Sequence, residues 1–292
     1  MDGSILITDQ NPRVSVLMAS FNHAKYVVDA INSVVNQTYK NIELIVIDDG
    51  STDGTAEKVA NLAKIHGFTF LQQENIGYQR TLIKLNALAT GKYISPFASD
   101  DIYELTKIEK LVQFLESNPQ YVAVHSKICI IDSDGVIQRV INEPCRSGKV
   151  FGELLRADFR INGISALVRT DVYRSVERHD DYVDDLPIWL EVAREHEIAF
   201  CDEVTARYRI HNNHLTSNTS RMMESEFKII SRYKDSPYYP DAALALYLRW
   251  FWVLAATDKG EAVKKLLIIG IVPKILFKTI FYKGLFRLLF RW

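Results

Sequence analysis

The chain has 292 residues, of which 48% are hydrophobic and 24% are charged, and its formal net charge at pH 7 is −1. This composition is that of a core-forming globular chain, and it excludes long disorder, a collagen-like repeat or a small disulfide scaffold. The near-zero net charge gives no electrostatic reason to expect nucleic acid as a partner. The length corresponds to about two domains of roughly 150 residues, or to one large α/β domain with an extension.

Strand and helix patterns alternate along residues 14–118. Short apolar runs predict strands, and apolar stripes at helical spacing predict the helices between them. The predicted strands are residues 14–19, 42–47, 68–71 and 92–96, and the predicted helices are residues 24–36, 55–66, 78–89 and 105–118. Because residues 42–47 are almost all apolar, this strand should be covered on both faces, as in a parallel sheet. The alternation indicates right-handed βαβ units.

The pattern changes after residues 121–126. Residues 128–131 and 136–140 flank Asp132-Ser-Asp-Gly135, a turn sequence typical of a hairpin and therefore of a mixed sheet. Two further helices are predicted at residues 149–157 and 184–196, two strands at 164–168 and 205–210, and helices from about residue 220 onward. We therefore predict an α/β fold with a mixed, mainly parallel sheet flanked by helices and a C-terminal helical extension.

Polar segments follow four of the predicted strands. They are Ala19-Ser-Phe-Asn22, Asp48-Asp-Gly-Ser-Thr-Asp-Gly54, Gln73-Glu-Asn-Ile-Gly77 and Ser99-Asp-Asp101. Because ligands of open parallel sheets bind at the carboxyl ends of the strands, we expect these segments to meet. Their acids and amides, together with the aromatic ring of Phe21, predict a pocket for a polar ligand that carries a flat ring.

Simpler interpretations of the acidic segments remain. Residues 49–54 match the first half of a calcium loop, but Ala60 stands where a bidentate glutamate is required, so calcium is not expected. This segment could instead form a turn and a helix cap, and Asp100 and Asp101 could cap the following helix. Two adjacent carboxylates after a buried strand nevertheless repel each other unless a cation is present, which favours a divalent metal.

Glycine-rich phosphate loops of the dinucleotide-binding and P-loop types are absent from the sequence. A bound diphosphate would therefore need a metal on Asp101 and a basic side chain such as Arg80 or Lys84.

The segments VSVLMASFNHAKYVVDAINSVVNQTYKNIELIVIDDGSTDGT, NIG and GKYISPFASDD resemble the catalytic domain of family 2 glycosyltransferases, and the resemblance covers about residues 13–215. It implies a GT-A (Rossmann-like) fold and an inverting activity that uses a nucleotide-sugar. Phe21 would stack on the base, Asp49 would accept hydrogen bonds from it, and Arg80 would approach the diphosphate. The whole implied nucleotide-sugar site consists of Ala19, Ser20, Phe21, Asn22, Asp49, Asn75, Gly77, Arg80, Ser99 and Asp100.

The same resemblance implies a metal site. Asp101 would bind Mg²⁺ or Mn²⁺, Asp100 would face the donor ribose and sugar, and His211 would complete the metal or diphosphate site. Many members of the family read D-x-D-D here, whereas this chain has Ala98 at the first position, which leaves the number of metal ligands open. On the residues alone, His211 could equally be a surface histidine near the end of a strand.

Inverting transfer needs a general base that removes the proton of the acceptor hydroxyl. Asp185, in Asp184-Asp-Leu-Pro-Ile-Trp189, resembles the acidic pair that begins a helix in this family, with Asp184 in place of the commoner glutamate. The acceptor side would include Asp184, Trp189, Asn162 and Gly163. The alternatives are helix capping for the acidic pair and a core position for Trp189.

The C-terminal region is basic and apolar. Residues 261–292 carry seven basic residues and one acidic residue, and residues 242–292 mix such cations with Leu, Ile, Phe and Trp. This composition suits helices that lie in an anionic membrane interface. The alternative is that these helices pack on the catalytic domain or on a second subunit.

The cellular location follows from what the sequence lacks. Residues 1–12 do not resemble a secretory signal, the three cysteines form no CxxC pair, and no apolar run reaches the length of a membrane span. We therefore expect a cytoplasmic protein that is peripheral on the inner face of the cell membrane.

The sequence thus predicts a catalytic domain over residues 1–220, with a nucleotide-binding half at about 13–101 and an acceptor half at about 102–220, and a basic helical region over 221–292. The expected reaction is metal-dependent transfer of a hexose or N-acetylhexosamine from a nucleotide-diphosphate donor, foremost a UDP-sugar. The acceptor would be a hydroxyl of a glycan or polyprenyl-linked glycan, in surface polysaccharide, lipopolysaccharide or capsule biosynthesis.

Two other classes of function compete with this one. A sugar-nucleotide nucleotidyltransferase would need a glycine-rich loop directly after the first strand, where this chain has Ala-Ser-Phe-Asn-His. The alternative that stays open is a non-catalytic nucleotide- or glycan-binding scaffold at the membrane. An oligomer is compatible with the sequence.

Overall fold

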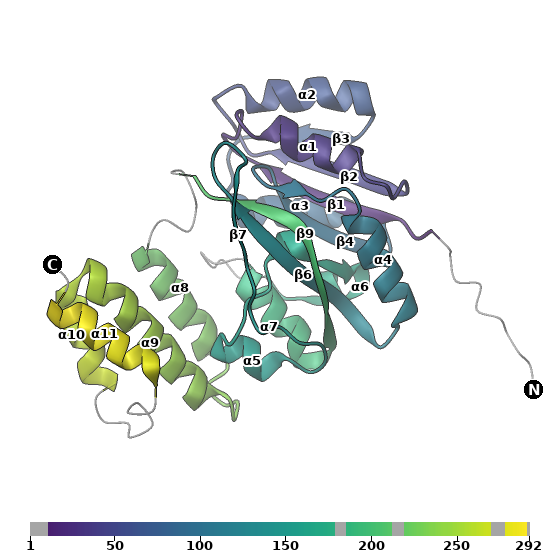
Figure 1. Cartoon of the computed structure of the whole chain (residues 1–292). Coiled ribbons are helices and arrows are strands. Elements are labelled where there is room, and N and C mark those ends of the chain that lie inside the picture. Colours follow the sequence, from purple (N-terminus) through teal and green to yellow (C-terminus); the bar gives the residue numbers. More distant parts are fainter. Residues whose placement is uncertain (1–10, 179–184, 212–218, 270–277, 291–292) are drawn as a thin grey trace, which may run out of the picture. The chain divides into compact units, whose positions relative to one another are not determined.

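A computed structural model of the chain describes residues 11–178, 185–211, 219–269 and 278–290 (Figure 1). The chain divides into two compact units. Unit 1 comprises Met1–Val150, Ile161–Asp180 and Asp184–His214, and unit 2 comprises Phe151–Arg160, Asp181–Val183 and Leu215–Trp292. All of the predicted site residues that the structure describes belong to unit 1.

A mixed β-sheet forms the centre of unit 1. Its strands among the described residues are β1 (Val14–Ser20), β2 (Ile42–Asp48), β3 (Thr69–Gln72), β4 (Tyr93–Ala98), β5 (Ile102–Tyr103), β6 (Tyr121–Ile131), β7 (Ile137–Val140), β8 (Leu167–Arg169) and β9 (Glu197–Arg209). They lie in the order β3-β2-β1-β4-β8-β6-β9-β5, with β7 paired to β6.

The first four strands in this order run parallel, and β8 is antiparallel to both of its neighbours, β4 and β6. β9 runs parallel to β6, while β5 and β7 are antiparallel to β9 and β6. The predicted mixed α/β fold is confirmed.

Helices cover the strands on the faces that their apolar stripes predict. The helices of unit 1 are α1 (Val27–Val35), α2 (Thr55–His66), α3 (Tyr78–Leu88), α4 (Lys107–Ser117), α6 (Thr170–Ser175) and α7 (Asp185–Glu195). Ile31 of α1 and Leu111 of α4 share one core with Val16 and Met18 of β1. Leu17 is also buried, and because side chains alternate along a strand it faces the other side of the sheet, where α3 contacts β1. β1 is therefore covered on both faces.

The structure also corrects some predicted limits. The helix expected at 24–36 begins only at Val27, because a turn precedes it in which the Tyr26 and Val27 N–H groups donate to the His23 carbonyl. The strand expected at 164–168 is β8, which begins at Leu167 because Asn162 caps a 3₁₀ turn, η1 (Gly163–Ser165).

Other differences concern the lengths of strands and helices, which the hydrophobic periodicity of the sequence does not resolve. β5 and α6 are too short for a periodic signal. The strand expected at 205–210 is only the last part of β9, which begins at Glu197.

Unit 2 is helical, as expected for the C-terminal extension. Its helices among the described residues are α5 (Phe151–Arg156), α8 (Thr219–Ser231), α9 (Tyr239–Thr257), α10 (Lys259–Ile269) and α11 (Thr279–Phe290). The buried Glu226 of α8 accepts hydrogen bonds from Arg160 at 3.0 Å and from Trp250 Nε1 at 2.8 Å, which ties α9 to α8. In the parts of the chain that the structure describes, no helix combines the length and hydropathy needed to span a membrane.

Candidate functional site

The segments that follow β1 and β2 are joined by hydrogen bonds. Asn22, which follows β1 and has a φ of 52°, donates its N–H to Ser51 Oγ at 2.8 Å. Its side-chain oxygen accepts the Thr52 N–H at 2.9 Å. A left-handed φ is tolerated by asparagine better than by most residues, which explains asparagine at this turn. Ala19 and Ser20 are buried at the end of β1, whereas the Phe21 side chain is 45% exposed and therefore available to a ligand.

Asp49 is buried and holds the segment that follows β3. One of its carboxylate oxygens accepts from Gln73 Nε2 at 2.8 Å and from the Ile76 N–H at 3.0 Å. The other accepts the Gly77 N–H at 3.0 Å. The structure therefore gives this acid protein partners on both oxygens, besides the role toward a base that the resemblance implies.

Asn75, Gly77 and Arg80 lie along this segment and the start of α3. Gly77 has a φ of 91°, which a residue with a side chain rarely adopts, so glycine is required at this turn. Asn75 passes so close to Gly50 that a Cβ on Gly50 would lie 2.8 Å from the Asn75 nitrogen. Asn75 and Arg80 are both exposed.

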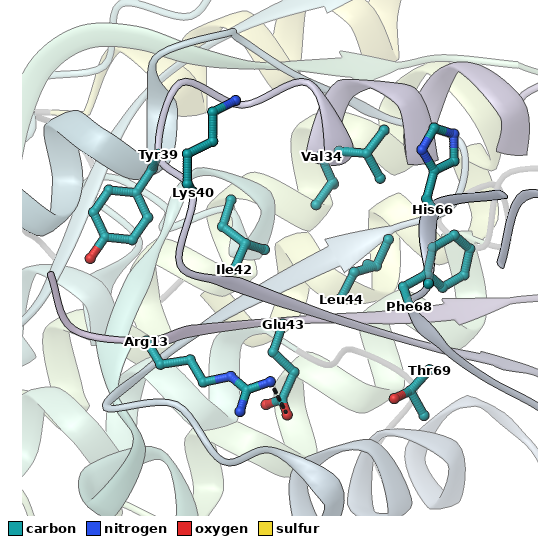
Figure 2. A pocket seen from close by; sticks show the side chains of 12 residues that line it. Arg13, Val34, Tyr39, Lys40, Ile42, Glu43, Leu44, His66, Phe68 and Thr69 are labelled. Atoms are coloured by element: carbon teal, nitrogen blue, oxygen red, sulfur yellow. Dashed lines mark ion pairs between the residues drawn. The ribbon is translucent and has the colours of Figure 1, made fainter. Parts of the chain in front are cut away.

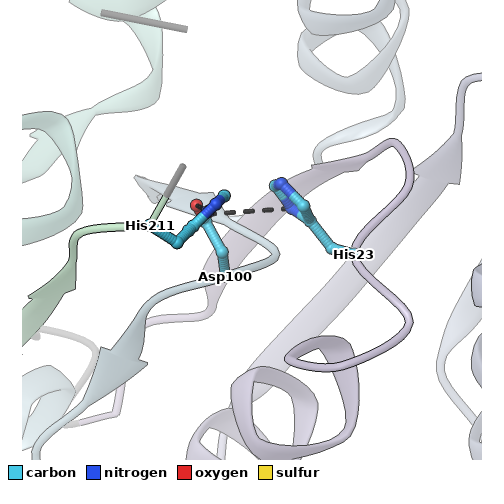
Figure 3. Close-up of side chains that lie close together, drawn as sticks. All are labelled: His23, Asp100 and His211. Atoms are coloured by element: carbon cyan, nitrogen blue, oxygen red, sulfur yellow. Dashed lines mark hydrogen bonds and ion pairs between the residues drawn. The ribbon is translucent and has the colours of Figure 1, made fainter. Parts of the chain in front are cut away.

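Asp100 lies between two histidines (Figure 3). His211 Nε2, just beyond β9, is hydrogen bonded to Asp100 Oδ2 at 2.9 Å. On the other side, His23 Nδ1 is hydrogen bonded to Ser99 Oγ at 2.8 Å and lies 3.9 Å from Asp100 Oδ1. One potential ligand atom from each of His23, Asp100 and His211 lies within 4.8 Å of the others, an arrangement that could hold a metal ion.

Asp101, the residue after Asp100, is fully buried. Its Oδ1 accepts the backbone N–H of Arg209 at 2.7 Å, while its Oδ2 has no hydrogen-bond partner among the described residues. Burial and the adjacent charge of Asp100 raise the pKa of Asp101 well above its usual value, and Asp185 raises it further. In contrast, the hydrogen bond from His211 and the charge of His23 keep the pKa of Asp100 low despite its burial. An orphaned, buried carboxylate oxygen next to a second acid is what a site for a divalent cation would contain.

Asp185 begins α7 and is held by Gly163. The Gly163 N–H donates to Asp185 Oδ2 at 2.8 Å, and a Cβ on residue 163 would lie only 2.6 Å from Asp185 Oδ1. Burial raises the pKa of Asp185 to about 6, although the Gly163 N–H and the charge of Arg178 oppose the rise. Because Asp185 influences the pKa of Asp101, the two acids belong to one electrostatic environment.

The remaining acceptor-side residues fall in different places. Asn162 accepts the Ile164 N–H with its side chain at 3.2 Å and so shapes the turn that carries Gly163. Trp189 is 2% exposed, and its indole N–H has no hydrogen-bond partner among the described residues. This burial matches the core position that was the alternative for Trp189. Asp184 lies outside the described residues.

Sequence reasoning missed His23 and Arg209. Arg209 donates through Nε to the Asp100 carbonyl at 2.7 Å and through NH1 to the Asp132 carbonyl at 3.2 Å, so it joins the β6–β7 turn to the acidic segment. His23 directly follows the predicted segment 19–22, and its position after the first strand was the signal that could have identified it. Arg209 lies in a strand, where nothing in the sequence marks its partners.

A separate surface hollow has a volume of about 240 Å³. Figure 2 shows side chains that line it. It is lined in part by Arg13, Ile42 and Glu43, at the amino ends of β1 and β2, and Arg13 forms an ion pair with Glu43 at 3.3 Å. Since the candidate site is built at the carboxyl ends of these strands, this hollow is not part of it.

A family model described as glycosyl transferase family 2 matches residues 15–176, which is more than half of the chain. The chain belongs to this family. An uncharacterized glycosyltransferase of Haemophilus influenzae is 30% identical over 243 residues, which cover 78% of this chain and 74% of that protein. One from Rickettsia conorii is 29% identical over 204 residues, covering 68% of this chain but only 33% of its relative, so the chain spans about a third of that protein.

Solved structures of two glycosyltransferases share the fold. A mannosyltransferase of Pyrobaculum calidifontis, in complex with GDP-Man and Mn²⁺, is 17% identical with a TM-score of 0.64, covering 96% of this chain and 86% of that one. TarS of S. aureus, residues 1–349 in complex with UDP-GlcNAc, is 14% identical with a TM-score of 0.63, covering 94% and 79%. These similarities confirm the predicted GT-A fold.

Proposed function

We propose that this family 2 glycosyltransferase transfers a hexose or N-acetylhexosamine, with inversion, from a UDP-sugar to a hydroxyl group of a glycan. The observation that carries the proposal is the acidic centre that follows β4, where Asp100 lies between His23 and His211 and the buried Asp101 keeps one carboxylate oxygen without a hydrogen-bond partner among the described residues. Asp185 acts on the pKa of Asp101 from the start of α7. The exposed ring of Phe21 at the end of β1 supports stacking of the nucleotide base on this edge.

Asp185 is the proposed general base. It would accept the proton of the acceptor hydroxyl as that oxygen forms a bond to the anomeric carbon, while the bond to the nucleoside diphosphate breaks on the opposite face. Its pKa of about 6 suits this role, because the carboxylate is mostly ionised at neutral pH and still basic enough to take a proton. The Gly163 N–H fixes the position of the carboxylate, and Asn162 shapes the turn that presents this N–H.

The residues present fit a divalent cation, Mn²⁺ or Mg²⁺. Asp101, with its orphaned Oδ2, and the ligand cluster of His23, Asp100 and His211 are the groups that would hold it. Bound there, the cation would stabilise the negative charge of the departing diphosphate as a Lewis acid. The exposed Arg80, at the start of α3, would add a positive charge on the nucleotide side.

We further propose that the acceptor is a lipid-linked glycan of surface polysaccharide, lipopolysaccharide or capsule biosynthesis, used at the cytoplasmic face of the membrane. The support for this part is the basic, apolar composition of residues 242–292. The catalytic domain would extend over residues 1–220, with the donor bound mainly by residues 13–101.

The test of the donor site is calorimetric titration of UDP, GDP and CDP into the purified full chain, with and without Mn²⁺. We expect UDP to bind more tightly when Mn²⁺ is present, and we expect the Asp101→Ala variant to lose this metal-dependent gain in affinity. Asp202→Ala is the matched control, because that side chain is 72% exposed and pairs with Lys127 on the surface.

Tighter binding of GDP than of UDP would leave the proposed transferase activity standing and would change the proposed donor from a UDP-sugar to a GDP-sugar. The absence of binding by all three nucleotides would overturn the proposal and favour the non-catalytic scaffold.

A further inference from the structure

Helix α11 packs against α9. Gly284 is buried at the contact, where a Cβ would collide with the ring of the fully buried Phe251. The partly buried Phe281, Leu285 and Leu288 pack against the same cluster. The absence of a side chain at residue 284 thus lets the two helices approach closely, and this contact fixes α11 against α9.

A second side of α11 is apolar and exposed. Tyr282, Phe286 and Leu289 are spaced i, i+4 and i+7, which places them in one stripe along the helix. They are 51%, 59% and 62% exposed. An exposed stripe of large apolar side chains on a helix whose other side is already packed is a feature of interaction surfaces.

Cations flank the stripe. Lys283 and Arg287 line a hollow of about 470 Å³ together with Trp252, Tyr282 and Phe286, and the guanidinium of Arg287 lies 3.8 Å from the Trp252 ring centre. Residues 262–292 contain no acidic residue. The surface therefore combines aromatic rings, aliphatic side chains and positive charge, which is the chemistry that an anionic membrane interface attracts.

A second copy of the chain fits this surface less well. Two copies that met through the same side of α11 would bring Lys283 and Arg287 of each close to those of the other, with no acid in residues 262–292 to offset the repulsion. Because α11 has 12 residues, it is also too short to cross a bilayer and would lie in the plane of its surface.

We propose that α11 docks this protein on anionic phospholipid, with Tyr282, Phe286 and Leu289 entering the interface and with Lys283 and Arg287 at the headgroup phosphates. The proposal deepens the membrane association proposed above by naming the surface and the lipid class. It does not depend on the nucleotide site, so either can fail alone.

The test is sedimentation of the full chain with vesicles of phosphatidylcholine alone or with phosphatidylglycerol added. We expect binding to the anionic vesicles, little binding to neutral ones, and release at high salt, because screening weakens surface charge interactions. Lys283→Gln should lower the partition coefficient about fivefold, because each cation near an anionic surface contributes about 1 kcal/mol to membrane binding. Leu289→Ser should lower it by a similar or larger factor.

Matched controls are Lys64→Gln and Ile65→Ser, two exposed positions on α2, which should leave vesicle binding unchanged. Circular dichroism and calorimetry with UDP verify that each variant is folded and keeps its nucleotide site. Equal binding to neutral and anionic vesicles, or unchanged binding by both α11 variants, would overturn the proposal. So would a dimer that Leu289→Ser dissociates, since the stripe would then be an interface between copies.

Discussion

Replacing Gly163 with alanine should displace the proposed base directly. The new Cβ would lie 2.6 Å from Asp185 Oδ1 and 3.3 Å from its Cγ, so the carboxylate must move. The Gly163 N–H donates to the other oxygen of the same carboxylate at 2.8 Å. Movement of Asp185 therefore also lengthens or breaks the hydrogen bond that positions it.

The size of the effect can be worked out from these contacts. A hydrogen bond to a charged group contributes about 1.5–3 kcal/mol, and its loss would raise the pKa of Asp185 by roughly one to two units at about 1.36 kcal/mol per unit. The parent value is about 6, and the Gly163 N–H is one of the interactions that keep it from rising further. Misplacing a catalytic group by about 1 Å costs on the order of 100-fold in rate.

We therefore expect Gly163→Ala to lower kcat about 100-fold. The acidic limb of its pH–rate profile should shift upward from the parent limb near pH 6, because Asp185 must be deprotonated to act as a base. The assay is release of nucleoside diphosphate in the presence of acceptor, from about pH 5 to about pH 9. Calorimetry of donor binding accompanies it and should show no change.

Gly260→Ala is the control, because among the described residues its Cβ would have only Asp258 Oδ1 within 4 Å, at 3.5 Å. If Gly163→Ala kept the parent kcat and the parent pH profile, the assignment of Asp185 as the base would be refuted.

Two further predictions concern the donor site and the core. Phe21→Ala should weaken UDP binding at least fivefold, since base stacking contributes about 1–3 kcal/mol. The Tm should change little, because the ring is 45% exposed. An unchanged calorimetric affinity for UDP would exclude stacking on Phe21. Lys107 is fully buried, its Nζ donates to Ser95 Oγ at 2.6 Å, and burial lowers its pKa well below 10.5. Because the unfolded chain then binds more protons, stability should rise with pH between the lowered pKa and 10.5. In thermal melts, Lys107→Met should raise Tm by a few degrees and should remove this pH dependence of stability, relative to the parent. A lower Tm with an unchanged pH dependence would contradict this account of Lys107.

The sequence predicts the edge of the sheet where the candidate site lies but not the contacts within it. A strand that ends in Asp48 and another followed by Asp100 and Asp101 can be recognised locally, because apolar runs and the residues after them are adjacent in the chain. The 2.9 Å contact between His211 and Asp100 joins residues 111 positions apart, and no periodicity reports such a pairing. Here only the resemblance to a family indicated His211.

The same limit explains His23 and Asp49. His23 reaches Ser99 and Asp100 because β1 and β4 are neighbours in the sheet, which the order of elements along the chain does not state. Asp49 appears in the sequence as an acid available to a ligand. In the structure its two oxygens accept hydrogen bonds from the segment after β3, because β2 and β3 are also neighbours.

The two adjacent acids have opposite environments, and this difference determines how metal and nucleotide should depend on each other. Histidines lower the pKa of Asp100, so the protein itself supports its negative charge. Asp101 receives one N–H from Arg209, and burial beside Asp100 raises its pKa well above the usual value. A diphosphate adds further negative charge at this edge, and repulsion from two ionised acids would oppose its binding.

A divalent cation on Asp101 would remove both obstacles, since it replaces the proton there and attracts the diphosphate. The affinity for the nucleotide should therefore rise with the metal, and by linkage the affinity for the metal should rise by the same factor with the nucleotide.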